Sequence, residues 1–284
     1  IFGIPGLKVH SKLLLIERRE RSGMRYYSHV GTGNFNEKTA RLYTDFSLLS
    51  YDQTIGRDIA EVFDFLKYTY RRPEYRLLLV SPHGTRPAII AMIEEEISNA
   101  EAGYRAAITI KCNNLVDKQV TEKLYDASAA GVDVRLIVRG MCSLLPGVEG
   151  ISENIRAISI VDRFLEHPRA YVFHNRGRPR YYIGSADLMT RNLDFRVEVL
   201  CPVFDEAAPD GVFFDVQDEI SIDLFELDDV FLTDARDRVA ARAHAPAVDG
   251  VARVDDGDVA DHRAALLGED VQLFPQRPDR DLEV

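Results

Sequence analysis

The sequence predicts an α/β fold made of two similar units, and three observations support this prediction. Between residues 75 and 140, apolar strand-like runs alternate with segments of helical length, which is typical of layered strands and helices with parallel strand pairing. A pattern of histidine, any residue and a basic residue, followed by a glycine-containing loop, occurs twice. The chain has 284 residues, 46% of them hydrophobic, which is enough for about two domains with a buried core.

The first unit is expected over residues 1–74. An apolar strand at 7–17, a polar turn and a second strand at 26–30 form a predicted β-hairpin that leads into a glycine-rich loop at 31–45. A helix is expected near 56–69, and the sequence "RRPEY" marks a boundary just after it.

The second unit is expected over residues 75–204, with mixed sheets flanked by helices. The predicted strands lie at 75–82, 104–112 and 132–140, and the predicted helices at 85–103 and 115–131. In the first of these helices, isoleucines recur every four residues, as expected of a stripe that faces the core.

Residues 205–284 form a third region that differs in charge. They contain 22 acidic and 7 basic residues, a net charge of −15, whereas residues 1–204 contain 28 basic and 24 acidic residues, a net charge of +4. Weak periodicity and many Asp and Ala residues predict a partly disordered tail. The mildly basic body is compatible with a polyanionic ligand, although the whole chain carries −11.

The composition also excludes several classes of protein. No run of 18 apolar residues is present, so no transmembrane segment is expected. The start, "IFGIPGLKVH", has neither an initiator methionine nor a signal-peptide pattern and reads as the interior of a longer protein. The cysteines are odd in number and lack metal-ligand spacing, which favours a reducing compartment; they are Cys112, Cys142 and Cys201.

The first copy of the repeated pattern lies in the strand "LKVHSKLLLI" at 7–16. Because side chains alternate along a strand, His10 and Lys12 are expected on one face. Taken alone, this pattern also fits an edge strand whose polar face meets water. The second copy, "LEHPRAYVF", places His167 and Arg169 in the same way, and the repetition favours a functional site.

Matched loops follow the two copies. In the first copy the downstream residues are Gly31, Thr32 and Asn34, and then Asp45 and Phe46; in the second they are Gly184, Ser185 and Asp187, and then Asp194 and Phe195. A histidine can attack phosphorus or deliver a proton near neutral pH. Lysine, arginine and loop amides can neutralise the charge on phosphoryl oxygens. The pattern therefore predicts phosphoryl chemistry between two half-sites.

The plan resembles that of the phospholipase D superfamily, in which H-x-K is followed after four residues by an acid and later by G-[ST]-x-N. Glu17 stands at the acid position of the first copy, and His174 stands there in the second. Longer strings, including "YYSHVGTGNFNEKTARLYTDFSLL", "NNLVDK" and "YYIGSADLMTRNLDFRVEV", are similar to the C-terminal half of polyphosphate kinases over residues 5–204. This resemblance implies two phospholipase D-like units, of which the first is truncated.

The resemblance also implies a reaction and roles for individual residues. His10 is expected to take the terminal phosphoryl group of ATP and to pass it reversibly to inorganic polyphosphate. Arg139 is expected to clamp phosphate, and His167 to act as the opposing acid or stabiliser. Tyr43 matches a nucleotide-contacting position, with a half-buried structural ring as its alternative. Lys12, Arg169 and Asn34 complete the expected substrate-binding set.

The resemblance implies partners and a cofactor as well. ATP or ADP and polyphosphate are the expected ligands, and nucleic acid is not. Mg²⁺ is expected from the family, with its ligands outside this chain, so no metal ligand is predicted here. A homo-oligomer is expected for the full-length family. The expected location is the cytoplasm, with membrane association as an open alternative.

Several motifs keep two interpretations. The stretch "SPHGTR" could place backbone amides and Arg86 at an anion site on a helix N-terminus, or it could be a simple capping turn. In "NNLVDK", Asn113, Asn114 or Lys118 could bind substrate or cap the next helix. His29 and His83 are interpreted as structural or exposed residues.

Two rival functions remain open at this point. A phosphodiesterase of the same superfamily is one, although Arg169 in place of Lys and Asp187 in place of Asn weaken a symmetric diesterase site. A polyphosphate-binding fragment without turnover is the other, because the N-terminal part of the family is absent from the sequence.

Overall fold

The computed structural model describes residue 4 and residues 6–204, so the predicted tail at 205–284 lies outside the described residues. The strands are β1 (Lys8–Val9), β2 (Lys12–Glu20), β3 (Gly23–Gly31), β4 (Tyr43–Thr44), β5 (Ser47–Ser50), β6 (Leu79–Val80), β7 (Ala107–Cys112), β8 (Asp133–Val138), β9 (Ile155–Ile158), β10 (Leu165–Glu166), β11 (Arg169–Phe173), β12 (Arg180–Gly184), β13 (Arg196–Val197) and β14 (Val199–Val203). The helices are α1 (Glu37–Ala40), α2 (Gln53–Lys67), α3 (Thr85–Glu101), α4 (Lys118–Ala129) and α5 (Thr190–Phe195), with a 3-10 turn at Asn175–Gly177.

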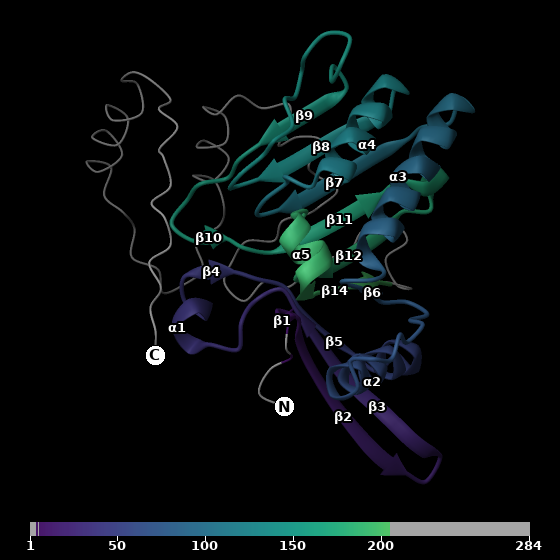
Figure 1. The fold of residues 1–284 in the computed structure, drawn as a ribbon, viewed down its shortest axis with the longest axis vertical. Helices are drawn as coiled ribbons and strands as arrows, with labels where there is room; N and C mark the ends of the chain where they lie inside the picture. The colour runs from purple at the N-terminus through teal and green to yellow at the C-terminus, as the bar shows by residue number, and fades with distance from the viewer. Residues whose placement is uncertain (1–3, 5, 205–284) are drawn as a thin grey trace, which may run out of the picture. The chain divides into compact units, whose positions relative to one another are not determined.

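The larger sheet has seven strands in the order β6-β14-β12-β11-β7-β8-β9. Strands β7, β8 and β9 pair in parallel, and the remaining neighbours pair antiparallel. Helices α3 and α4 lie against this sheet (Figure 1). The predicted α/β class with mixed pairing is therefore confirmed.

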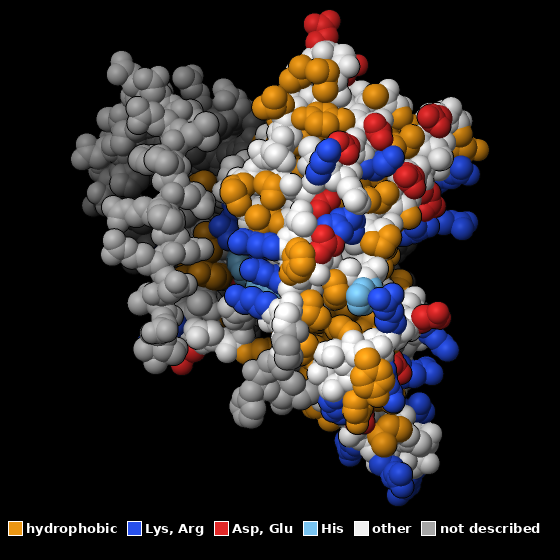
Figure 2. Space-filling view, in the orientation of Figure 1, with side chains coloured by type: hydrophobic (Ala, Val, Ile, Leu, Met, Phe, Trp, Pro, Cys, Tyr) orange, Lys and Arg blue, Asp and Glu red, His pale blue; other side chains and the backbone are white. Residues whose placement is uncertain are grey.

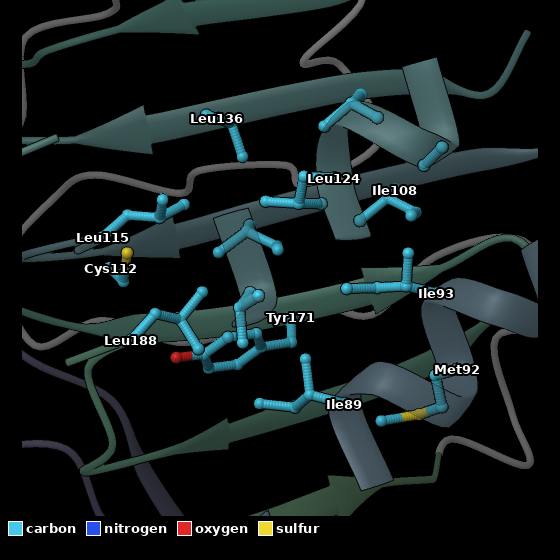
Figure 3. Packing of buried hydrophobic residues seen from close by; sticks show 14 of the residues in the cluster. Ile89, Met92, Ile93, Ile108, Cys112, Leu115, Leu124, Leu136, Tyr171 and Leu188 are labelled. Atoms are coloured by element: carbon cyan, nitrogen blue, oxygen red, sulfur yellow. The ribbon is translucent and has the colours of Figure 1, made fainter. Parts of the chain in front are cut away.

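A single apolar cluster fills the space between these helices and the sheet. Ile89 and Ile93 of α3 and Leu124 of α4 point toward Ile108 of β7 and Tyr171 of β11, and all five side chains are fully buried (Figure 3). Burial of each such side chain stabilises the fold by about 1.5–3 kcal/mol. The predicted stripe of α3 is thus one wall of the core.

The smaller sheet is the predicted hairpin with one added strand, in the order β2-β3-β5. Helix α2 covers one face, where Val30 packs with Ile55, Ile59 and Val62. The hairpin is antiparallel throughout, and Lys and Arg side chains gather near its tip (Figure 2). That clustering follows from the sequence "ERRERSGMR" at the turn.

Two short parallel strand pairs connect the two units. Strand β1 pairs with β13, and β10 pairs with β4. The predicted continuous strand at 7–17 is wrong at one point, because the chain breaks between β1 and β2. There the backbone N–H groups of His10 and Ser11 both donate to the carbonyl oxygen of Val197 at 3.0 Å. Because of this break, His10 belongs to neither β1 nor β2.

The predicted strand at 75–82 is also shorter in the structure. The buried carboxylate of Asp58, on α2, accepts hydrogen bonds from the backbone N–H groups of Arg76, Leu77 and Leu78 at 3.2, 2.7 and 3.0 Å. Those donors are therefore unavailable to a sheet, and only β6 remains. No helix in the described part of the chain has the length and apolar composition that crossing a membrane requires.

Candidate functional site

The short strand pairs place each histidine opposite a carboxylate from the other unit. Val9 pairs with Val197 in parallel register, so the residues that follow them, His10 and Glu198, stand side by side. His10 Nδ1 lies 2.9 Å from Glu198 Oε2. Glu198 is fully buried, and its Oε1 accepts a hydrogen bond from Asn192 Nδ2 at 2.7 Å. A buried carboxylate therefore fixes the His10 ring.

The second half-site repeats this arrangement with the units exchanged. Glu166 pairs with Thr44, and the residues that follow, His167 and Asp45, meet with Nδ1 at 2.7 Å from Oδ1. The same Asp45 oxygen accepts a hydrogen bond from the Thr32 hydroxyl at 2.6 Å. Each unit therefore supplies the histidine of one half-site and the carboxylate of the other.

The loop hydroxyls that follow each hairpin fix the backbone next to these carboxylates. Thr32 N–H donates to Phe46 O, and Phe46 N–H donates to Thr32 Oγ1. In the second unit, Ser185 N–H donates to Val199 O, and Val199 N–H donates to Ser185 Oγ. In each case the partner is the residue just after the carboxylate. The repeated Gly-[Ser/Thr] dipeptide thus forms the backbone latch, a pair of hydrogen bonds to the residue that follows Asp45 or Glu198.

The sequence analysis matched Asp194 with Asp45, whereas in the structure Glu198 holds the position equivalent to Asp45. Asp194 accepts hydrogen bonds from Arg86 and does not pair with His10. Glu198 lies fourteen residues after Gly184, the same separation that joins Gly31 to Asp45. Equal spacing from the loop glycine was therefore the signal that could have identified Glu198. The sequence analysis also missed Asn192, for which the repeat gives no equivalent amide.

The two residues at the superfamily's acid position have no part in this arrangement. Glu17 is exposed on β2, away from the strand breaks at the histidines. His174 follows β11 and accepts a hydrogen bond from Gly177 N–H in the 3-10 turn. Glu198 and Asp45 supply the carboxylates instead.

Lys12 is buried next to His10. Its Nζ donates to the His10 carbonyl oxygen at 2.5 Å, and it has no other hydrogen-bond partner among the described residues. Burial lowers the Lys12 pKa to about 8, while the Glu198 carboxylate opposes this shift. A lysine ammonium has three donors, so two remain for a ligand.

Arg169 occupies the equivalent position in the second half-site, with different bonding. Its Nε and Nη2 donate to the two carboxylate oxygens of Asp187 at 3.2 and 3.1 Å, in a buried bidentate pair. The two departures from the superfamily pattern, Arg for Lys and Asp for Asn, therefore compensate each other. Desolvation raises the pKa of Asp187, but Arg169 outweighs it and the net pKa is lowered.

The remaining Arg169 nitrogen holds His167. Nη1 donates to the His167 carbonyl oxygen at 2.8 Å and lies 3.1 Å from His167 Nε2. An arginine can only donate, so His167 Nε2 accepts from Arg169 through its lone pair. His167 Nδ1 then carries the proton and donates it to Asp45. Desolvation lowers the His167 pKa, and the charges of Arg169 and Lys12 add to this effect. The hydrogen bond to Asp45 opposes this shift, and the net lowering of the pKa favours the neutral imidazole.

His10 differs from His167 in the hydrogen bonding of its second ring nitrogen. Its Nδ1 is held by Glu198, whereas its Nε2 has no hydrogen-bond partner among the described residues. The His10 side chain is 20% exposed, compared with 10% for His167. The free lone pair of the site is therefore on His10.

Arg139 and Tyr43 border this centre. Arg139 Nε donates to Asn113 Oδ1 at 2.8 Å, and Asn113 N–H donates to Asp187 Oδ1 at 2.8 Å. Burial and the neighbouring Arg169 lower the Arg139 pKa. The Tyr43 ring lies 5.1 Å from the His167 ring, centroid to centroid. Tyr43 and Arg139 also line a cavity of about 390 Å³ with residues 160–166.

Of the predicted residues, the structure brings together His10, His167, Lys12, Arg169, Tyr43 and Arg139. Asn34 is exposed in its loop, and its side chain makes no hydrogen bond to another described residue. Its counterpart in the second loop, Asp187, is buried on Arg169. The equivalence of the two loops thus ends at this position.

A buried ion pair lies next to the second half-site. Lys111 Nζ lies 3.0 Å from Glu166 Oε2, and both side chains are about 95% buried, with 4% and 5% exposed. Desolvation lowers the Lys111 pKa, while Glu166 opposes this shift. Because Glu166 precedes His167, this pair connects β7 to the strand that presents the histidine.

The described residues do not form a metal site. They contain no group of three or more His, Cys, Asp or Glu side chains placed to hold a metal ion. The carboxylates nearest the centre are committed, Glu198 and Asp45 to histidines and Asp187 to Arg169.

Comparison with known proteins shows which family the sequence matches. Residues 1–72 match the family described as "Polyphosphate kinase C-terminal domain 1", and residues 78–222 match "Polyphosphate kinase C-terminal domain 2". Over 205 residues, or 72% of the chain, the sequence is 58% identical to a polyphosphate kinase of Vibrio parahaemolyticus and 55% identical to one of Escherichia coli K12. The chain spans about 30% of the length of these relatives.

A solved structure shows the same similarity in three dimensions. The crystal structure of polyphosphate kinase from Porphyromonas gingivalis superposes with a TM-score of 0.68 at 42% sequence identity, over 72% of this chain and 32% of that one. The structural similarity covers the same share of the chain as the similarity in sequence.

Proposed function

The chain belongs to the polyphosphate kinase family, and we propose that it carries the phosphoryl-transfer centre of an ATP–polyphosphate phosphotransferase. In this proposal His10 is the nucleophile. The observation that carries it is the asymmetry of the two imidazoles: within residues 6–204, His10 Nε2 has no hydrogen-bond partner, whereas His167 Nε2 faces Arg169. Since the chain is a minor part of its relatives, the activity is proposed for these residues within a complete enzyme.

The proposed first step forms a bond between His10 Nε2 and the terminal phosphorus of ATP. The phosphorus–oxygen bond to ADP breaks, and ADP leaves with the electron pair. The imidazole becomes positively charged while Nδ1 keeps its proton, and Glu198, at 2.9 Å, stabilises that charge. In the second step, a terminal oxygen of polyphosphate attacks the phosphorus and restores the free lone pair of His10.

The other residues position and stabilise the transferring group. The uncommitted donors of Lys12 and the guanidinium of Arg139 are suited to phosphoryl oxygens. Because its pKa is lowered, His167 is proposed to stabilise the transferring group as a neutral imidazole and not to donate a proton at pH 7. Tyr43, in the cavity with Arg139, is proposed to contact the nucleotide, and Asn34 the substrate from its loop.

The remaining assignments follow from the family. We propose a partial first catalytic domain at 1–74, a second at 75–204 and an acidic tail at 205–284. Mg²⁺ is the proposed metal, held with the nucleotide by groups outside the described residues, and no step above passes through it. ATP or ADP and polyphosphate, and no nucleic acid, are the proposed ligands. A homo-oligomeric enzyme in the cytoplasm is the proposed setting, with membrane association as the alternative.

The test is a chimera: the V. parahaemolyticus polyphosphate kinase with its matched 205 residues replaced by those of this chain. We expect ATP-dependent growth of polyphosphate and the reverse formation of ATP from ADP, both lost in His10→Ala. This chain alone is expected to have little activity. Cleavage of a phosphodiester in place of transfer would favour the diesterase, and polyphosphate binding without turnover in the chimera would favour the binding fragment.

A further inference from the structure

The short helix α5 is held in place by groups from α3 and α4. It has six residues, and a helix of this length is not stable by itself. Arg86 of α3 donates to the Asp194 carboxylate near the end of α5. At the beginning of α5, the Thr190 hydroxyl donates to Asp117 Oδ2 at 3.4 Å, and Asp117 is also bound by Arg86. These contacts fix the turn of helix that carries Asn192.

The Asn192 side chain is fully buried and makes one hydrogen bond to the described part of the chain. Its Nδ2 donates to Glu198 Oε1 at 2.7 Å. Its Oδ1 is buried and has no hydrogen-bond partner among the described residues. A buried acceptor without a partner lowers the stability of a fold. The stability of the core therefore does not explain why an amide stands at this position.

Glu198 uses a different carboxylate oxygen for each of its two side-chain hydrogen bonds. Oε1 accepts from Asn192, and Oε2 faces His10 Nδ1 at 2.9 Å, so the carboxylate is held at both ends. Arg196 Nη1 is 4.0 Å from Oε1, which is beyond hydrogen-bond distance. Asn192 is therefore the group that fixes the Glu198 carboxylate on the side away from His10.

The second half-site has a different arrangement. A single oxygen of Asp45, Oδ1, accepts from both the Thr32 hydroxyl and His167 Nδ1. No amide donor holds the other oxygen of Asp45 among the described residues. Of the two half-sites, the one that contains the proposed nucleophile is thus the one whose carboxylate has an amide donor.

We propose that Asn192 is a positioning residue, which acts through Glu198 to keep the His10 proton on Nδ1 and the lone pair on Nε2. An amide N–H can only donate, so it favours a Glu198 oxygen that carries no proton. The other Glu198 oxygen is then available to accept from His10 Nδ1. The inference rests on the proposed function, because it concerns the same nucleophile, and it adds the residue that prepares His10 for attack.

The direct test measures which ring nitrogen of His10 carries the proton. Imidazole ¹⁵N resonances of the full 284-residue chain distinguish the two tautomers, and His10→Gln assigns the His10 signals. We expect the Nδ1–H form to predominate in the wild type. In Asn192→Leu and in Asn192→Ala, the ratio of the Nδ1–H form to the Nε2–H form should fall by about tenfold, as expected for the loss of one hydrogen bond to a charged group. The first variant replaces the volume of the amide and the second does not, so a packing defect in one is recognised by comparison with the other.

The matched control is Asn154→Leu. Asn154 Nδ2 donates to the Ser128 carbonyl oxygen at 2.9 Å, so this variant loses a similar amide hydrogen bond that does not involve Glu198. It should leave the His10 tautomers unchanged. An unchanged tautomer ratio in both Asn192 variants would overturn the inference.

A kinetic measurement in the chimera separates positioning from general damage. Asn192→Leu should slow His10 phosphorylation by about tenfold without changing the KM for ATP. It should cause no further slowing when Glu198→Gln is already present, because the two residues act as one unit. Equal slowing with and without Glu198→Gln would show that Asn192 does not act through Glu198, and would overturn the inference. An inactive chimera would instead contradict the proposed function, whereas the tautomer ratio in the chain alone would still decide the role of Asn192.

Discussion

The two half-sites hold their histidines in the same way and differ in the cation beside them. In both, a two-residue strand pair sets a histidine against a carboxylate from the other unit. In the first, the single hydrogen bond of Lys12 to another part of the described chain goes to the backbone oxygen of His10. In the second, Arg169 is bound by Asp187 and contacts the His167 ring. One scaffold thus gives one histidine with a free nitrogen and one whose nitrogen is occupied.

This difference teaches that a repeated motif does not imply repeated chemistry. The backbone hydrogen bonds at Thr32 and Ser185 and the two histidine–carboxylate contacts are common to the two halves, so they reflect how the scaffold is built. The side chains at the Lys12 and Arg169 positions decide what each histidine can do. The predictions below alter one half at a time.

The largest effect is expected from breaking the Arg169–Asp187 pair. Arg169→Leu leaves a buried carboxylate without its partner, which should lower the free energy of unfolding by about 3–5 kcal/mol. Urea denaturation measures this, with the exposed Arg191→Leu as the matched control. The double variant Arg169→Leu/Asp187→Leu should recover most of the loss. A loss below about 1 kcal/mol in the single variant would show that the pair is not structural.

The next effect concerns the two carboxylates. In the chimera, Glu198→Gln should slow phosphorylation of His10 by on the order of a hundredfold, because the charged imidazole loses its counter-ion. Asp45→Asn should slow it less, by roughly tenfold, since His167 remains neutral in the proposed step. Rapid-quench measurement of the phosphorylated enzyme compares them. A larger slowing by Asp45→Asn than by Glu198→Gln would contradict the roles assigned to the two half-sites.

A smaller effect is expected from pH. The Lys12 pKa is lowered to about 8, so Lys12 loses its proton as the pH rises through this value. His10 phosphorylation should therefore decline above pH 8, by about tenfold for each further unit. Lys12→Arg should move this decline upward, because arginine keeps its charge. If the rate of His10 phosphorylation declines at the same pH in the wild-type and Lys12→Arg chimeras, a group other than Lys12 causes the decline.

The smallest effect is expected in the stability of the second half-site. The folded-state pKa of His167 lies below its ordinary value of 6.5, so the favourable contribution of neutral His167 is present above pH 6.5. It is lost as the pH falls from 6.5 through the lowered pKa. The free energy of unfolding should then fall less steeply with acid in His167→Asn than in the wild type. The exposed His83→Gln is the control, and an identical slope in His167→Asn would contradict the prediction.

Local features of the fold could be predicted from the sequence. The hairpin and its loop were predictable from apolar runs around a polar turn, and α3 from its isoleucine stripe. Helix α2 begins three residues before the predicted start, because the Asp52 side chain caps it by accepting hydrogen bonds from the N–H groups of Thr54 and Ile55. The strand at 75–82 failed because Asp58, distant in sequence, takes its N–H groups.

The candidate site was predictable where the motif itself carried the signal. His10, His167, Lys12 and Arg169 were found from the repeat, and the structure places them together. Glu198 was missed because its contact with His10 spans 188 positions in sequence and joins two units. Contacts of this kind depend on strand register, which a local pattern does not encode.

The most direct test of the account is the position of the phosphoryl group on the protein. The chimera, incubated briefly with ATP labelled in its terminal phosphate, should form an acid-labile, base-stable phosphoramidate. Mass spectrometry should place it on His10; His10→Ala should abolish the label, and His167→Ala should slow turnover without abolishing it. A label on His167, or one that persists in His10→Ala, would contradict the assignment of the free nitrogen of His10 as the nucleophile.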